Sequence, residues 1–511
     1  MLTCSGNNLA QTIVKNASAN LVRLAGTGII ALLLPPFLVR ELSKDTYAAW
    51  AILLQLTLYV TYLDFGIQTA VSRFVAHEEE LHNTRERDSI VSTAFALLTL
   101  AACLGCIVIA VLAWQLPAIF KQMPAALYLP ARIGLLLMGT TLAIGLPVNV
   151  IQALFIGKQR NEIPAAIGVA NKVAMAIFVV AVVLKRWDLA AMGAAVALAN
   201  VLSYAASYFA WRHWAAQVRI RVALVSKQYA RIVTTYSGAV MVSSIAMLMI
   251  SGLDLTIVGI FDYKSTAYYA IAATLSTFVA QAHGAVFSAL LPASAVLTAR
   301  QDSHQLGALL LTSTRYGVLL LLAISVPLLV GGHFIIMHWA GADYAEHSTL
   351  ILMVLLTANI VRLTCLPYAT LLLGTGQQGK AMVSPIAEGV TNLVASIIGA
   401  VTLGALGVAV GTLIGSVVGV ALHLFYNVPR TSLISINRRQ LIKQGLLRPL
   451  SCVLPFLLIL PFLSTRSIIS GDSHQSLLVV ATAGAILLFW NCGLLSSDRQ
   501  RLTQVLHLSG E

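Results

Sequence analysis

Long apolar runs separated by short polar connections fill most of the chain. About 20 apolar residues suffice to cross a bilayer as a helix, and an open-ended span must be helical because its backbone polar groups have no water to bind. The strand alternation of a membrane barrel is absent. The pattern predicts fourteen membrane helices, near residues 20–40, 47–70, 89–114, 132–154, 164–184, 189–210, 234–260, 267–291, 315–337, 348–373, 382–402, 406–427, 449–463 and 475–496.

Composition supports the same fold class, an all-α polytopic membrane protein. Hydrophobic residues make up 58% of the 511 residues and charged residues only 10%, and the mean hydropathy is +0.86. A soluble domain is about 25% charged, so a water-soluble enzyme and a disordered chain are both excluded. The six cysteines are scattered, and we expect neither a disulfide framework nor a metal site.

The net charge of +13 follows from the placement of the basic residues. Of the 32 Lys and Arg residues, 22 lie at the N-terminus and in the even-numbered connections, and 8 lie in the odd-numbered ones. Because cytoplasmic connections carry the excess of Lys and Arg, we expect both termini in the cytoplasm. No nucleic-acid partner is needed. The basic connections serve either as solvated orientation signals or as contacts with membrane lipids.

Three sequence matches indicate an internal repeat of six helices. Gly157-x-Gln followed by Pro164 resembles Gly376-x-Gln followed by Pro385, and two further matches have similar spacing and the same order. Six helices return the chain to the same side, so the repeats have parallel topology, as in transporters that bind their substrate between two lobes. We predict an N-terminal lobe over 1–231, a C-terminal lobe over 232–430, and a linker with two further helices over 431–511.

Polar residues within the predicted helices are the candidate site, because ionisable groups in a bilayer usually face a cavity. Asn16, Asn20, Arg23 and Thr27 share one face of the first helix, which either lines a cavity or caps the helix at the headgroups. The deepest cations are Lys172 and Arg362. The remaining lumen and coupling candidates are Asp64, Asn149, Asn171, Asp254, Glu388 and Asn392.

The opening of the chain resembles a known family. Leu32-Leu-Leu-Pro35-Pro36, a short turn, Tyr47-Ala-Ala-Trp50, and then Leu63-Asp64-Phe65-Gly66 before a basic connection are similar to the polysaccharide-transport (Wzx-type) flippases. These flippases belong to the multidrug/oligosaccharidyl-lipid/polysaccharide exporter superfamily. The resemblance extends over the first twelve predicted helices and includes Asp254 before Tyr268-Tyr269.

Membership would imply a two-lobed molecule around a central lumen, in a bacterial inner membrane. The substrate would be an undecaprenyl-diphosphate-linked oligosaccharide, whose negative charges suit Arg23, Lys172 and Arg362. A titrating carboxylate, Asp64 or Asp254, would couple transport to protons or sodium. The alternative is a structural role, with Asp64 paired to Arg73 or the carboxylate held at a helix end. We expect no other cofactor, and polysaccharide polymerase machinery as a further partner.

Two other functions are compatible with the sequence. A multidrug antiporter of the same superfamily would export organic cations and favour an acidic lumen. A membrane-embedded polysaccharide polymerase or ligase would need catalytic groups on a sizeable external loop, whereas the predicted external connections are short. The chain carries no phosphate-binding glycine loop, H-E-x-x-H or G-x-S-x-G motif, so we expect a transporter without catalytic residues.

Overall fold

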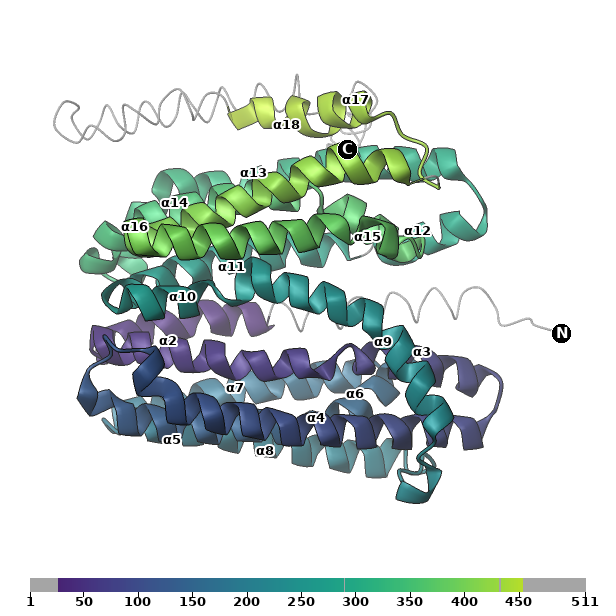
Figure 1. Cartoon of the computed structure of the whole chain (residues 1–511), viewed down its shortest axis with the longest axis horizontal. Coiled ribbons are helices and arrows are strands. Elements are labelled where there is room, and N and C mark those ends of the chain that lie inside the picture. The colour runs from purple at the N-terminus through teal and green to yellow at the C-terminus, as the bar shows by residue number, and fades with distance from the viewer. Residues whose placement is uncertain (1–25, 289, 432, 454–511) are drawn as a thin grey trace, which may run out of the picture.

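The computed structural model describes residues 26–453, except 289 and 432, and this part of the chain is helical without a strand (Figure 1). A helix over residues 26–41 precedes the first bundle. The helices of the first bundle are α2 (Lys44–Leu58), α3 (Ile67–Glu80), α4 (Thr84–Ile119), α5 (Ala125–Ile144), α6 (Val148–Gly157), α7 (Glu162–Leu184) and α8 (Leu189–Trp214).

A long bent element connects the first bundle to the second. Helix α9 (Lys227–Met247) continues through a π-helical turn, Leu248–Gly252, into α10 (Asp254–Phe261). The other helices of the second bundle are α11 (Thr266–Phe287), α12 (Leu290–Ala299), α13 (Ser303–Trp339), α14 (Ala342–Leu363), α15 (Leu366–Gly374) and α16 (Val383–Leu422). The short helices α17 (Arg438–Gln440) and α18 (Arg448–Leu450) follow them.

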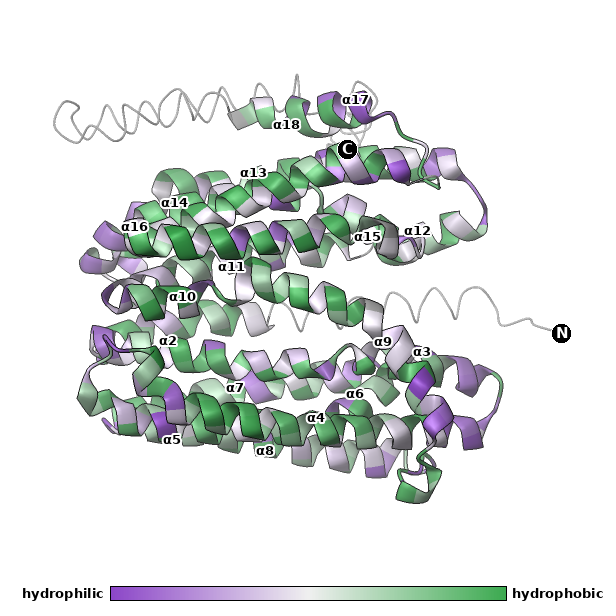
Figure 2. Cartoon of the chain, in the orientation of Figure 1, coloured by the Kyte–Doolittle hydropathy of each residue, from purple (hydrophilic) through white to green (hydrophobic). Residues whose placement is uncertain are grey.

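The protein is an all-α polytopic membrane protein. Nine helices in the described ranges are long and apolar enough to cross a membrane, and the bent pair in α9 and its π-helical turn makes a tenth. Figure 2 shows hydrophobic residues along the middle of the helices and hydrophilic residues gathered toward their ends. Described helices lie in each of the first twelve predicted spans, whereas residues 20–25 of the first span, most of the thirteenth span and all of the fourteenth lie outside the described residues.

Helix α16 is two helices joined by a sharp turn at Gly404. This residue has φ +60° and ψ −138°, in the left-handed half of the map, where only glycine avoids strain. Gly399 lies against Gly407, Ser396 against Gly411, and Asn392 against Gly415. The two halves of α16 are therefore antiparallel neighbours, as the short connection predicted at residues 403–405 requires.

The two bundles lie side by side with their helices roughly parallel, and α9 passes from one to the other (Figure 1). In the first bundle α5 and α7 pack against α8, and in the second α13 and α16 pack against α14. The helix over 26–41 lies between the bundles, since Gly26 faces Val169 of α7 and Gly28 faces Phe278 of α11. The domain boundaries expected from the repeat remain predictions.

The connections predicted to face outward meet at one end of the molecule, which we call the closed end. Gln122 donates to the carbonyl of Phe261 at 3.1 Å, and the Tyr263 hydroxyl donates to the carbonyl of Asp45 at 2.8 Å. The Asp262 carboxylate accepts from the backbone N–H of Ala405. Odd-numbered connections from both bundles thus share one end, as the alternation of spans predicts.

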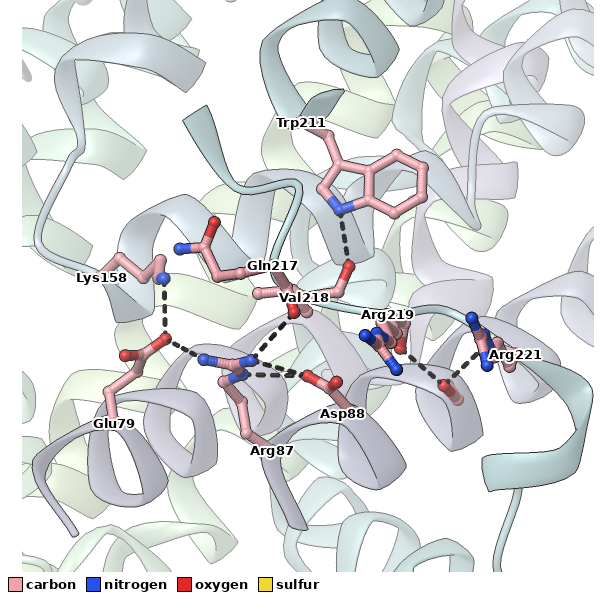
Figure 3. A network of polar contacts seen from close by, with 10 residues as sticks. Glu79, Arg87, Asp88, Lys158, Trp211, Gln217, Val218, Arg219 and Arg221 are labelled. Carbon is pink, nitrogen blue, oxygen red and sulfur yellow. Dashed lines mark hydrogen bonds and ion pairs between the residues drawn. The ribbon is translucent and has the colours of Figure 1, made fainter. Parts of the chain in front are cut away.

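A polar network at the opposite end holds three connections of the first bundle together (Figure 3). Arg87, at the start of α4, forms ion pairs with Glu79 and Asp88, both at 2.8 Å, and donates to the carbonyl of Gln217. Lys158, after α6, forms an ion pair with the same Glu79 at 2.8 Å. Burial opposes the charge of Glu79, but hydrogen bonds from Lys158 and Arg87 hold the pKa of this carboxyl below its usual range.

Candidate functional site: a cavity between the bundles

A cavity of about 860 Å³ lies between the two bundles. The helix over 26–41, α2 and α7 line it on one side, and α10, α11, α14 and α16 line it on the other. Most lining side chains are apolar, but charged groups from both bundles reach it. The predicted site residues on its wall are Asn171, Lys172, Asp254, Arg362 and Glu388.

Lys172 is the cation that the first bundle contributes. It lies twelve residues before Leu184, the end of α7, and therefore about 18 Å along the helix at 1.5 Å per residue. Its side chain is exposed to the cavity, and no hydrogen bond or ion pair joins it to another described residue. The neighbouring Asn171 donates instead to Asn200 of α8, at 3.3 Å.

Arg362 is the cation that the second bundle contributes, and other side chains orient it. Its Nη2 donates to the Oδ1 of Asn359, one turn earlier in α14, at 2.7 Å. Asn359 is buried and donates to both the carbonyl and the hydroxyl of Ser276 in α11, at 2.9 and 2.7 Å. The Nη1 of Arg362 is buried without a hydrogen-bond partner in the described structure. The guanidinium is thus oriented through Nη2, while Nη1 can still donate a hydrogen bond to a ligand.

Asp254 is a buried carboxylate whose oxygens are already bound. It begins α10, directly after the π-helical turn, and is 7% exposed. Its carboxylate accepts from Thr412 at 3.1 Å, from Tyr269 at 3.3 Å and from Asn392 at 3.5 Å. Three donors stabilise its charge, because hydrogen bonds to a carboxylate favour the ionised form.

Glu388 differs from Asp254 in having no such donors. It lies near the start of α16 and is 5% exposed, and its Oε1 has no hydrogen-bond partner in the described structure. Arg362 interacts electrostatically with both Glu388 and Asp254, yet no ion pair joins it to either within the described chain. Among the described residues, the charged part of the cavity wall therefore consists of two cations and two carboxylates, with the carboxylates more deeply buried.

Other predicted site residues lie elsewhere. Asn392 binds the π-helical turn, donating to the carbonyls of Met249 and Ile250 at 3.0 and 2.6 Å. Asp64 does not line the cavity. Its carboxylate accepts a hydrogen bond from the backbone N–H of Gln68 at 3.3 Å. No ion pair joins Asp64 to Arg73 within the described residues, so the alternative that Arg73 holds Asp64 structurally is wrong.

The guanidinium of Arg73 lies instead over the Tyr236 ring, with its central carbon 4.9 Å from the ring centre. Asn149, in α6 just after Pro147, is half-buried and off the cavity wall. Asn20 and Arg23 lie outside the described residues, although Thr27 of the same stripe lines the cavity.

Two further polar features of this region were missed by the sequence interpretation. The Ser276–Asn359 pair that orients Arg362 joins residues 83 positions apart, so spacing along the chain does not reveal it. Gln55 of α2 reaches across the bundles to donate to the carbonyl of Gly252 in the π-helical turn. A glutamine within a predicted membrane helix was the available signal for the second feature.

A cluster of polar and aromatic side chains lies where the two bundles meet at the closed end. Lys44 of α2 forms an ion pair with Asp343 of α14 at 2.8 Å and donates to the hydroxyl of Tyr268 of α11 at 2.8 Å. The same hydroxyl donates to Asp343 at 3.0 Å, and the Tyr268 ring stacks on His347. We call Lys44, Tyr268, Asp343 and His347 the clamp. It joins the two bundles directly.

Comparisons with known proteins agree with this architecture. The family model described as polysaccharide biosynthesis protein matches residues 13–298, more than half of the chain. No curated protein matches the chain significantly in sequence. Among solved structures, the lipid II flippase MurJ in an inward closed conformation is similar with a TM-score of 0.72 at 12% identity, covering 93% of this chain and 98% of that one.

Transporters of the MOP superfamily share the fold too. An inward-facing multidrug resistance MATE family transporter gives a TM-score of 0.63 at 13% identity, with 80% of this chain and 97% of that chain covered. A point mutant of the Vibrio cholerae MATE transporter VcmN gives 0.61 at 14% identity, with 84% and 98% covered. The chain therefore belongs to the polysaccharide biosynthesis protein family and has the fold of the flippases and transporters of the MOP superfamily.

Proposed function

We propose that the protein is a flippase that moves an undecaprenyl-diphosphate-linked oligosaccharide across the bacterial inner membrane for surface or exported polysaccharide. The observation that carries this proposal is the pair of cations on the cavity wall, one from each bundle. Lys172 has no protein partner in the described structure, and Arg362 keeps one donor unused.

An unpaired cation inside a bilayer is costly, at about 2.5–3.5 kcal/mol on insertion scales. A diphosphate offsets that cost when it arrives and restores it when it leaves, which a permanent ion pair does not do. Arginine suits this ligand because its planar fork donates two parallel hydrogen bonds to phosphate oxygens. The fixed guanidinium of Arg362 therefore has the chemistry of a headgroup contact.

The rest of the cavity suits the other parts of such a substrate. Amide and hydroxyl groups on its wall, including Asn171, Asn200 and Gln281, offer hydrogen bonds to sugar hydroxyls, while the apolar lining suits a prenyl chain. The clamp ties the two bundles together at one end, and alternating access requires such a contact on the closed side. Arg23 and Asn20 remain candidates for further contacts with the substrate.

The alternative of an organic-cation antiporter fits the cavity less well. Such a substrate favours accessible carboxylates, but Asp254 and Glu388 are only 7% and 5% exposed, and Lys172 would repel a cation. The fold alone does not separate the two, since both kinds of transporter have it. The solved structures similar to this chain are described as a flippase and transporters, which favours transport over a polymerase or ligase.

The test is complementation of a strain that lacks this gene. We expect Lys172→Ala and Arg362→Ala to stop surface polysaccharide and to accumulate lipid-linked oligosaccharide on the cytoplasmic leaflet, at normal protein level. Arg362→Lys should recover only part of the function, because the fork is lost. Lys227→Ala and Arg300→Ala remove exposed cations off the cavity wall and serve as matched controls. Normal polysaccharide from the Lys172→Ala, Arg362→Ala double variant would contradict the proposal.

A further inference from the structure

Glu388 is a buried carboxylate that the proposed transport cycle does not yet use. It lies on the cavity wall beside Arg362, and its Oε1 has no partner in the described structure. We propose that Glu388 is a proton-binding site that controls whether Arg362 is free to bind the anionic substrate. This inference rests on the proposed function for its substrate, but the proton site itself can be tested without one.

The position of Glu388 is built into the α16 hairpin. Its Oε2 lies against Gly419 in the opposite half of α16, where a Cβ would collide with the carboxylate. The carbonyl of Gly419 accepts from Ser384, at 2.6 Å. A glycine at 419 thus gives the carboxyl group room beside the hairpin, where no described donor binds Oε1.

Burial without donors makes the ionised form of Glu388 expensive unless a cation compensates it. The available cation is Arg362, which already interacts with it electrostatically. When Glu388 is ionised, its negative charge offsets part of the positive charge of the Arg362 guanidinium. When a proton from the aqueous phase binds the carboxylate, that attraction ends and the guanidinium is left to an anion. A proton and a diphosphate headgroup therefore favour each other's binding.

The other titratable and charged groups around Glu388 either have hydrogen-bond partners of their own or lie on a different part of the cavity. Asp254 of α10 has three hydrogen-bond donors. His423, in the π-helical turn after α16, has its Nδ1 at 3.1 Å from the side chain of Asn427. Cys365, between α14 and α15, is buried beside Thr364. Lys172 faces the cavity from the other bundle. Glu388 is therefore the carboxylate on this wall that combines burial with an unmet oxygen.

The first experiment measures diphosphate binding against pH. The purified protein in nanodiscs is titrated with farnesyl diphosphate from mildly acid to mildly alkaline pH. We expect wild-type affinity to fall by about tenfold as pH rises through the titration of Glu388, within the usual range of coupling between two sites. Glu388→Gln should keep the tight binding at every pH, and Glu388→Asp should keep a pH dependence.

The control for this titration is Glu346→Gln, which removes an exposed carboxylate near the clamp, away from the cavity wall. The probe has its own titration, but that contribution is the same for every variant, so the difference between wild type and Glu388→Gln isolates the residue. Identical pH profiles for these two proteins would overturn the proposal.

The second experiment detects the proton directly, without substrate. Infrared difference spectra between acid and alkaline samples should contain the carbonyl stretch of a protonated carboxyl group that is lost in Glu388→Gln and kept in Glu346→Gln. Absence of that band in wild type would refute the proton site. A band that is present while farnesyl diphosphate binds at no pH would instead support the proton site and contradict the proposed function.

Discussion

The clamp at the closed end sets how readily the two bundles separate, and Asp343→Asn is the mildest way to weaken it. Asparagine keeps an oxygen that accepts from Lys44 and Tyr268, so the variant removes the charge of Asp343 and little else. The side chains of Lys44 and Asp343 are 51% and 46% exposed. At this exposure water screens most of the attraction, and an ion pair contributes about 0–1 kcal/mol.

We therefore expect Asp343→Asn to shift the equilibrium between closed and open forms of this end by at most about fivefold, which corresponds to about 1 kcal/mol. Tyr268→Ala should shift it further. That variant removes two hydrogen bonds, the stack on His347 and an edge-to-face contact with Tyr344, and aromatic pairs alone contribute about 0.5–1.5 kcal/mol each.

The assay is the distance distribution between spin labels placed at Arg186 and Lys264, in a cysteine-depleted background. These exposed residues lie in connections of different bundles at the closed end. A longer-distance population should grow slightly in Asp343→Asn and strongly in Tyr268→Ala, and high salt should imitate the first effect. Glu346→Gln is the control. An unchanged distribution in Tyr268→Ala would refute the view that the clamp holds the bundles together.

Three further outcomes are expected. Asn359→Ala should lower transport while Asn359→Asp partly retains it, because only the latter still offers an oxygen to Arg362, and equal loss in both, at normal expression, would contradict the orienting role. Glu79→Gln should lower the unfolding temperature at neutral pH by the equivalent of about 1 kcal/mol. Because the pKa of Glu79 is lowered in the folded state, the difference from wild type should vanish as pH falls through that pKa. A difference that persists in acid would count against the ion pairs. Reporter fusions after Arg221 and Arg439 should show cytoplasm and those after Asp262 and Ala342 the outside, whereas a cytoplasmic signal at Asp262 would reverse the orientation.

The membrane helices were predictable because bilayer crossing depends on local composition. Runs of apolar residues therefore located the first twelve spans, and the turn at residues 403–405 was found although both flanking helices are apolar. The positions of Lys172 and Arg362 on a cavity wall also follow from a local rule, that deep charges avoid lipid.

Pairwise geometry was not predictable in the same way. Asn392 is polar and deep, like Asn171, yet it donates to backbone carbonyls of the π-helical turn. No pattern in the sequence predicts that turn. Arg73 follows Asp64 in sequence but stacks on Tyr236, which α9 brings from far along the chain. Periodicity gives the face of a helix that a residue occupies, and the fold decides which neighbour meets that face.

Transport of the lipid-linked oligosaccharide by this protein is tested most directly by reconstitution in liposomes. Purified protein is inserted into vesicles that contain fluorescent undecaprenyl-diphosphate-linked oligosaccharide, and the fraction reaching the opposite leaflet is measured by reagent accessibility. We expect movement by wild type and by the Lys227→Ala, Arg300→Ala control, and no movement above empty vesicles by Lys172→Ala, Arg362→Ala. Equal movement by the cavity double variant and wild type would contradict the role of these two cations in moving the substrate.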